Sequence, residues 1–216
     1  MKRTLAKSSL LTALNLLFFT AIGTLLLAFV YSQTRDAITH SEEQERLKLI
    51  AQIVPPGISD NDIVHDTLRI PPSELLGTSD TMTGYRASLR GEPTAVVLQA
   101  IAPDGYAGKI GLILAIRSNG EIAGVRVVSH NETPGLGDYI DIKKSPWIKG
   151  FDGKSAQGYN NTDWKVKKDG GKFDYMAGAT ITPRAVVKAV HKALQYFAQN
   201  RDTLLAPTAS SGKPQG

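Results

Sequence analysis

A long uncharged stretch lies near the beginning of the chain. From residue 10 to residue 30 the sequence reads LLTALNLLFFTAIGTLLLAFV, 21 residues without a charge. About 20 apolar residues cross the hydrocarbon core of a bilayer as a helix. Threonine hydroxyls can bond back to such a helix, whereas the Asn15 amide indicates either a contact with another membrane helix or a position near the head groups. The pattern predicts a transmembrane helix at 10–30.

The next part of the chain changes pattern twice. Residues 36–54 scatter apolar positions among charges, which is typical of a polar helix, and we expect it to end at Pro55-Pro56-Gly57. Residues 57–92 are rich in turn formers and favour no particular element. We therefore expect residues 31–92 to form a membrane-proximal helix and a connecting region.

Strand patterns follow from residue 93 on. The segments 94–102, 109–117 and 121–129 are apolar and β-branched, and Ser118-Asn119-Gly120 is a strong hairpin signal. Within the last segment, Val125 and Val127 are expected to point inward, and the intervening Arg126 and Val128 to lie on a less buried face. A further short strand is predicted at 165–166. These elements predict an antiparallel sheet.

The last pattern is helical. Thr182 is expected to be the N-cap and Pro183 the first helical residue, followed by one apolar stripe. That stripe consists of Val186, Val187, Val190, Leu194 and Phe197. Residues 206–216 contain few apolar residues and are expected to be disordered. The predicted fold is α+β: one N-terminal transmembrane helix, then a domain at 93–205 on an antiparallel sheet with flanking helices.

Charge gives the predicted membrane helix a direction. Lys2, Arg3 and Lys7 precede the uncharged stretch, whereas Arg35 and Asp36 nearly cancel after it. Positive flanks stay in the cytoplasm, so we expect residues 1–9 to be cytoplasmic and the domain to be extracytoplasmic. A cleaved signal peptide is the alternative, but its apolar region is normally about 7–15 residues long.

Composition excludes several classes of chemistry. The net charge is +5, but the basic residues after residue 7 are interspersed with acidic ones, so no nucleic-acid partner is expected. The chain has no cysteine, which excludes thiol catalysis, disulfides and iron–sulfur ligation by its own residues. Its four histidines are scattered without metal-ligand spacing, so no metal site is expected.

The segment with the clearest chemical potential is DYMAGATITPR at 174–184. A turn of small residues presents the Thr180 hydroxyl immediately before the predicted helix. Free N–H groups at a helix start favour an anion, and small residues let a phosphate approach the backbone. A turn followed by a capped helix is also common without any ligand, and the local pattern leaves both interpretations open.

This segment resembles the flavinylation motif of the FMN-binding domain family, Asp-x-x-Ser/Thr-Gly-Ala-Thr-x-Ser/Thr. Asp174, Gly178, Ala179, Thr180 and Thr182 match the motif, and Ala177 departs from it. The resemblance implies that a flavin transferase uses FAD to join the FMN phosphate to Thr180, giving one covalent FMN per chain.

A second stretch resembles the same family. It comprises Gly105-Tyr106-x-Gly108 and, after the hairpin, the segment Glu132-Thr133-Pro134-Gly135-Leu136-Gly137, so that the resemblance covers about residues 94–200. The cofactor-binding residues that the resemblance implies are Thr180 as the attachment site with Gly178, Ala179, Ile181, Thr182, Glu132, Thr133, Gly135 and Leu136.

The chain as a whole is similar to the family of G subunits of Rnf/Rsx ion-translocating electron-transport complexes. The resemblance implies an electron-carrying subunit in the cell inner membrane, rather than an enzyme on its own, whose partners are other membrane subunits. In some bacteria it also implies a role in keeping a redox-sensing regulator reduced. A Gly-x-Gly-x-x-Gly fingerprint for nicotinamide binding is missing. The alternatives are the C subunit of a sodium-translocating NADH:quinone reductase and a signal-anchored binding domain without cofactor.

Several other residues have two interpretations. His130 lies near the Glu132 segment and is either a flavin contact or a surface histidine. Lys165, Lys167 and Lys168 are either partners of an anionic flavin or a solvated charged edge. Trp147 and Trp164 either stack on a flavin ring or pack in the core.

Overall fold

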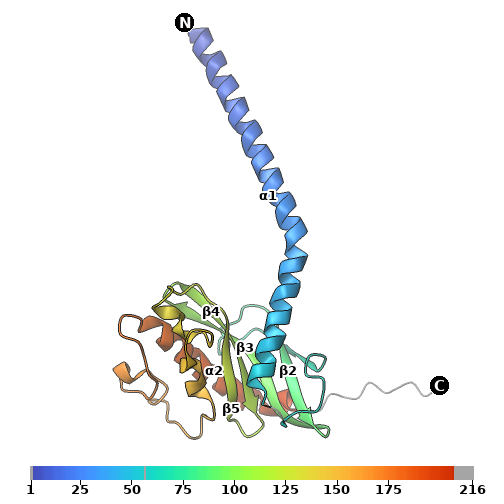
Figure 1. The fold of residues 1–216 in the computed structure, drawn as a ribbon, viewed down its shortest axis with the longest axis vertical. Coiled ribbons are helices and arrows are strands. Elements are labelled where there is room, and N and C mark those ends of the chain that lie inside the picture. Colours follow the sequence, from blue (N-terminus) through green and yellow to red (C-terminus); the bar gives the residue numbers. More distant parts are fainter. Residues whose placement is uncertain (1, 56, 207–216) are drawn as a thin grey trace, which may run out of the picture. The chain divides into compact units, whose positions relative to one another are not determined.

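The computed structural model describes residues 2–55 and 57–206, which fall into two compact units, Met1–Arg46 and Leu47–Gly216. The tail predicted to be disordered, 206–216, lies outside the described residues except for Ala206. The elements of the second unit form a five-stranded sheet with helices against it (Figure 1). The α+β prediction is confirmed.

Helix α1 runs without interruption over Lys2–Ile53. Its segment Lys7–Arg35 is long and apolar enough to cross a bilayer, and its large apolar side chains are exposed. The hydroxyls of Thr12 and Thr20 donate to the carbonyls of Ser8 and Leu16 at 3.0 and 2.8 Å, as expected for threonines in an apolar helix. The helix ends two residues before Pro55, because proline cannot continue it.

The sheet is antiparallel throughout, in the order β1-β2-β3-β4-β5. Its strands are β1 Thr67–Ile70, β2 Met82–Leu89, β3 Glu92–Gly105, β4 Gly108–Arg117 and β5 Ile122–Ser129. The last three contain the predicted segments, and the hairpin at Asn119-Gly120 is confirmed. β1 and β2 come from residues 57–92, where the sequence pattern favoured no element.

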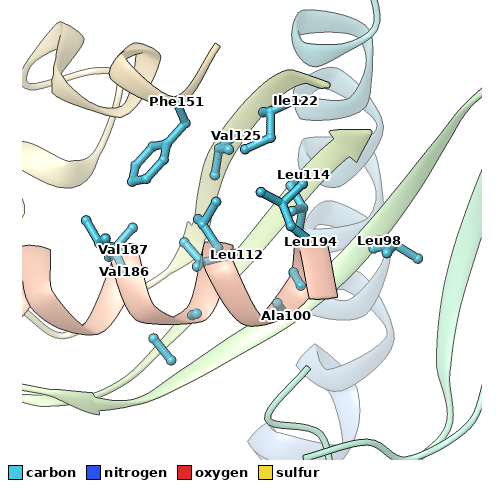
Figure 2. Packing of buried hydrophobic residues seen from close by; sticks show 14 of the residues in the cluster. Leu98, Ala100, Leu112, Leu114, Ile122, Val125, Phe151, Val186, Val187 and Leu194 are labelled. Atoms are coloured by element: carbon cyan, nitrogen blue, oxygen red, sulfur yellow. The ribbon is translucent and has the colours of Figure 1, made fainter. Parts of the chain in front are cut away.

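One face of the sheet packs against helix α2, Ile181–Leu204. Leu98, Leu112 and Leu114 from the sheet meet the predicted stripe of α2, all of which is buried (Figure 2). Burial of each such side chain stabilises the fold by about 1.5–3 kcal/mol. The short 3-10 helices η1 Gly137–Ile140, η2 Pro146–Phe151 and η3 Lys167–Asp169 lie in the connection between β5 and α2.

The opposite face of the sheet packs against the end of α1. Ile50, Ile53 and Val54 form a second core cluster with Val97 and Ile113. The sheet is therefore covered on both faces. Successive side chains along a central strand enter the two core clusters in turn.

Two predictions for the strands were wrong. Arg126 is only 6% exposed, because the end of α1 covers its face, and its Nε donates to Gln52 Oε1 at 3.2 Å. At 165–166 there is no strand: Val166 forms a single bridge with Phe173, and η3 follows at once.

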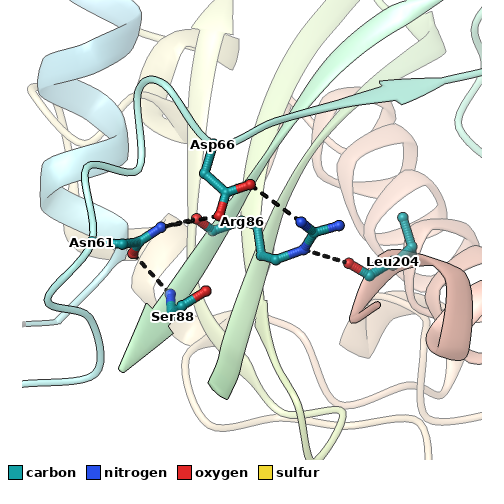
Figure 3. Close-up of polar contacts among 5 residues, drawn as sticks. All are labelled: Asn61, Asp66, Arg86, Ser88 and Leu204. Atoms are coloured by element: carbon teal, nitrogen blue, oxygen red, sulfur yellow. Dashed lines mark hydrogen bonds and ion pairs between the residues drawn. The ribbon is translucent and has the colours of Figure 1, made fainter. Parts of the chain in front are cut away.

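A buried arginine joins β2 to the end of α2. Arg86 Nε donates to the Leu204 carbonyl at 3.3 Å, and Nη1 donates to Asp66 Oδ1 at 3.2 Å (Figure 3). Asn61 Nδ2 donates to Asp66 Oδ2 and to the Arg86 carbonyl, and its Oδ1 accepts from Ser88 N. Because these polar groups satisfy one another, the guanidinium can be buried without a large cost.

Candidate functional site

Helix α2 begins earlier than the sequence predicted. Its first residue is Ile181, so Thr180 occupies the N-cap position, and the Thr180 side chain makes no capping hydrogen bond. Thr182 is the second helical residue and is 1% exposed. The prediction of Thr182 as the N-cap was wrong, because its hydroxyl has a distant partner instead.

That partner is Glu132, in the segment after β5. The Thr182 hydroxyl donates to Glu132 Oε2 at 2.5 Å, and the amide of Ala107 donates to Oε1 at 3.1 Å. Glu132 is itself 4% exposed. One buried carboxylate thus connects three segments: the turn between β3 and β4, the segment 131–137 and the start of α2.

Glycines make this close approach possible. A Cβ at Gly137 would lie 2.7 Å from Glu132 Oε2 and 2.9 Å from the Thr182 hydroxyl, and a Cβ at Gly105 would lie 2.8 Å from Glu132 Oε1. Real Cβ atoms do not approach so closely. Gly178 has a φ of +87°, a left-handed conformation that side chains disfavour. The turn before Thr180 therefore requires glycine for its conformation, and the carboxylate requires glycines for space.

The loop between residues 174 and 179 is held by two aromatic side chains. Trp147 Nε1 donates to the Asp174 carbonyl at 2.8 Å, and the Met176 amide donates to the Tyr139 hydroxyl at 3.3 Å. Burial raises the pKa of Tyr139 to about 12, with the bond from Met176 opposing that shift. The phenol therefore stays neutral near pH 7. The Asp174 carboxylate pairs with Lys167 at the surface.

A pocket of about 280 Å³ lies between these segments. It brings together eight of the nine predicted site residues from two distant parts of the sequence: Glu132, Thr133, Leu136, Gly178, Ala179, Thr180, Ile181 and Thr182. Gly135 does not line the pocket, and its amide donates to Asp138 Oδ1 at 2.8 Å. Tyr106 and Gly137 line it but were not among the predicted site residues, although both occur in the matched motifs.

The rim of the pocket is apolar. Tyr106, Leu136 and Ile181 line it with 68%, 46% and 46% of their surface exposed, and Tyr175 and Met176 are exposed in the adjacent loop. They are five of the seven large apolar side chains that are exposed between residues 47 and 206. Concentrated apolar exposure of this kind marks a binding surface.

The residues with two interpretations do not meet in the pocket. His130 Nδ1 accepts from the Glu132 amide at 3.1 Å, and Lys165, Lys167 and Lys168 lie exposed away from the lining. Trp164 is 4% exposed and stacks on His191 at 5.1 Å, and Trp147 packs partly buried against the same core. The core interpretation is confirmed for Trp164, whereas Trp147 is only partly buried against the core. Within the described residues no group of acidic and histidine side chains is arranged to hold a metal ion.

The chemistry of the pocket fits FMN. Thr180 supplies a hydroxyl without a capping bond, the first turn of α2 supplies amides that have no helical acceptor, and the rim supplies apolar surface for an aromatic ring. The volume of about 280 Å³ is slightly below the usual range for small-molecule pockets, roughly 300–1,000 Å³, so FMN would extend over the rim.

Comparisons with known proteins agree with this geometry. A family described as FMN-binding domain matches residues 105–195, and a family described as RnfG N-terminal region matches residues 1–53. A Pseudomonas aeruginosa protein, named as the G subunit of an ion-translocating oxidoreductase complex, is 47% identical over 206 residues, 95% of this chain and 96% of its own length.

Relatives of the same name come from other bacteria. The Shewanella loihica protein is 45% identical over 95% of both chains, and a Vibrio cholerae protein is 45% identical over 88% of this chain and 91% of its own length. The resemblance inferred from the sequence motifs is confirmed. The chain belongs to the family of G subunits of ion-translocating oxidoreductase complexes, and it contains an FMN-binding domain.

Proposed function

We propose that this chain is an electron-carrying subunit of a membrane-bound ion-translocating redox complex, with one FMN attached through a phosphoester to Thr180. The observation that carries the proposal is the pocket, because it joins the Gly178-Ala179-Thr180 turn to the segment after β5. The two segments are separated by about forty residues of sequence, yet both line the pocket that contains Thr180, whose hydroxyl makes no capping bond.

The attachment is a group transfer for which FAD is the co-reactant. The Thr180 Oγ1 forms a bond to the phosphorus of the FMN half, the pyrophosphate bond of FAD breaks, AMP leaves, and the hydroxyl proton passes to a base. A flavin transferase is the proposed catalyst of this step. Thr182 offers no comparable hydroxyl, because its side chain is buried and donates to Glu132.

The chain's own residues then hold and shield the cofactor. When bound, FMN supplies the one- and two-electron chemistry, and the protein supplies position and environment. Amides at the start of α2 are suited to the phosphate charge, and the apolar rim of Tyr106, Leu136 and Ile181 is suited to the ring. We propose the nine residues predicted from the sequence as the cofactor site, with Gly135 acting through the shape of the loop, and residues 93–205 as the cofactor-binding region.

We further propose that α1 anchors the chain in the cell inner membrane. The segment Lys7–Arg35 supports an anchor, and Lys2 and Arg3 before it, with Lys7 at its start, support a cytoplasmic N-terminus with an extracytoplasmic flavin domain. Asn15 is a candidate contact to another protein of the complex within the membrane. A reporter active only outside the cytoplasm, fused after residue 216, should be active, and activity of a cytoplasm-only reporter there would contradict this orientation.

The decisive experiment measures covalent flavin on the full chain made together with the flavin transferase. Wild type should gain the mass of FMN less one water and fluoresce on a denaturing gel. Thr180→Val removes the acceptor oxygen while keeping the side-chain shape, so we expect the mass gain and the fluorescence to vanish while the unfolding midpoint stays nearly unchanged.

Thr67→Val is the matched control, because it removes an exposed threonine hydroxyl of β1 that does not line the pocket and should leave the covalent mass gain in place. Wild type without added mass would favour a cofactor-free binding domain. Flavin persisting in Thr180→Val would move the attachment site. The regulator-reducing role uses the same electron transfer, and we expect Thr180→Val to abolish it together with ion translocation.

A further inference from the structure

The hydrogen bond between Glu132 and Thr182 takes no part in the attachment chemistry, but it holds the start of α2 against the segment after β5. Both side chains are almost fully buried, at 4% and 1% exposure, and both line the same pocket as Thr180. Their bond of 2.5 Å joins residues fifty positions apart in sequence. It is therefore a tertiary contact that fixes where the first turn of α2 lies.

The other oxygen of Glu132 fixes the opposite wall of the pocket. It accepts from the amide of Ala107, in the turn that also carries the exposed Tyr106. A side chain at position 105 or 137 would collide with this carboxylate, so both positions require glycine. Glu132 thus sets the spacing between the start of α2 and the turn between β3 and β4, which are two walls of the pocket.

We infer that Glu132 is a positioning residue that immobilises the flavin held at Thr180, by keeping the two walls of the pocket at a fixed separation. The inference rests on the proposed attachment. It assigns to Glu132 a role through Thr182 and Ala107 rather than a contact with the reacting part of the cofactor. Since hydrogen bonding and not charge carries this role, Glu132→Gln should preserve it: the amide oxygen can accept from Ala107 and the amide nitrogen can donate to the Thr182 hydroxyl.

The test measures how freely the covalent flavin moves in the full-length protein, purified in detergent after co-expression with the flavin transferase. Time-resolved fluorescence anisotropy separates a ring that turns with the protein from one that reorients in picoseconds to nanoseconds. Wild type and Glu132→Gln should show mainly the slow component. Glu132→Ala and Thr182→Val should lose most of it while keeping covalent flavin.

A double variant and a distant control separate positioning from general stability. In Glu132→Ala combined with Thr182→Val the flavin should be no more mobile than in Glu132→Ala alone, because that single variant already removes the bond between the two side chains. Thr94→Val removes another hydroxyl, one that donates to the Ile58 carbonyl and also lies 3.1 Å from the Ala87 carbonyl. It lies at the other end of β3 from Gly105, about 35 Å away at the usual strand rise, and should leave the slow component unchanged.

The outcomes are distinct for the two proposals. Wild-type chain without covalent flavin contradicts the proposed function. Covalent flavin that is immobile in wild type and equally immobile in Glu132→Ala contradicts the positioning role alone. The positioning role is also contradicted if the flavin of the wild type is as mobile as flavin on a labelled peptide. It is contradicted as well if the flavin is as mobile in Glu132→Gln as in Glu132→Ala.

Discussion

The two ends of helix α2 both rest on a buried charged side chain, yet they are built differently. At the start, Glu132 accepts from Thr182 and Ala107 and borders an open pocket. At the end, Arg86 donates to Leu204 and to Asp66 within a closed polar network (Figure 3). Each charge has the sign that suits its end of the helix dipole.

The difference indicates that the end of α2 at Arg86 is built for stability, whereas the start of α2 at Glu132 is built to leave space for a ligand. Arg86 has an acidic partner, and the residues around it use their polar groups on one another. Within the described part of the chain, the Glu132 carboxylate has a hydroxyl and an amide as its partners, and it borders the pocket. We therefore expect changes at Arg86 to affect mainly stability, and changes near Glu132 to affect mainly the cofactor.

The largest expected effect is at the closed end. Arg86→Met leaves the Asp66 carboxylate and the Leu204 carbonyl without the guanidinium, and should lower the free energy of unfolding by about 3–5 kcal/mol. Denaturant unfolding measures this loss. Adding Asp66→Asn should recover part of it, and covalent flavin per folded chain should stay at the wild-type level. A loss of flavin from the folded single variant would remove the distinction between the two ends.

The intermediate effect is at the open end. Gly137→Ala puts a methyl group 2.7 Å from Glu132 Oε2, so we expect a loss of about 1–3 kcal/mol in stability together with a more mobile flavin. Gly150→Ala is the matched control, because nothing lies within 4 Å of an added Cβ there. Thermal unfolding and fluorescence anisotropy would check both variants. Equal behaviour of the two would show that the space beside Glu132 is not limiting.

The smallest effect on stability is expected at His191, in the middle of α2. His191 stacks on Trp164, and burial lowers its pKa below the ordinary value of 6.5. The folded state thus disfavours the proton, so the contribution of His191 is complete above about pH 6.5 and is lost as pH falls through its folded pKa. Unfolding midpoints between pH 7.5 and pH 5 (about the range in which histidine titrates) should fall less in His191→Phe than in wild type. Parallel curves would contradict a half-buried neutral imidazole.

The sequence predicted the parts of the fold that depend on local patterns. β3, β4 and β5 follow from β-branched segments and the Asn119-Gly120 turn, and the stripe of α2 follows from its spacing. β1 and β2 were not predicted, because both lie in residues 57–92, which are rich in turn formers. β1 is also short and lies at the edge of the sheet. The burial of Arg126 was missed because the end of α1, more than seventy residues earlier, covers it.

For the candidate site, the sequence identified the residues but not their roles. The two motif segments were recognised, and the structure brings eight of the nine predicted residues to one pocket. Thr182-Pro183 looks locally like a cap and a first helical residue, but Glu132 takes the Thr182 hydroxyl and the helix begins at Ile181. No local signal predicts a partner fifty residues away.

The bare start of α2 has a consequence for the order of events in maturation. Thr180 occupies the N-cap position of the 24-residue helix without making a capping bond, and Pro183 has no N–H, so the amides of Ile181 and Thr182 are the first-turn donors that lack a capping acceptor. A phosphate esterified to that hydroxyl would bring acceptor oxygens and negative charge to these amides. With the attachment proposed above, the modification would be the last step of folding, because the phosphate would supply acceptors that the polypeptide alone lacks at the start of α2.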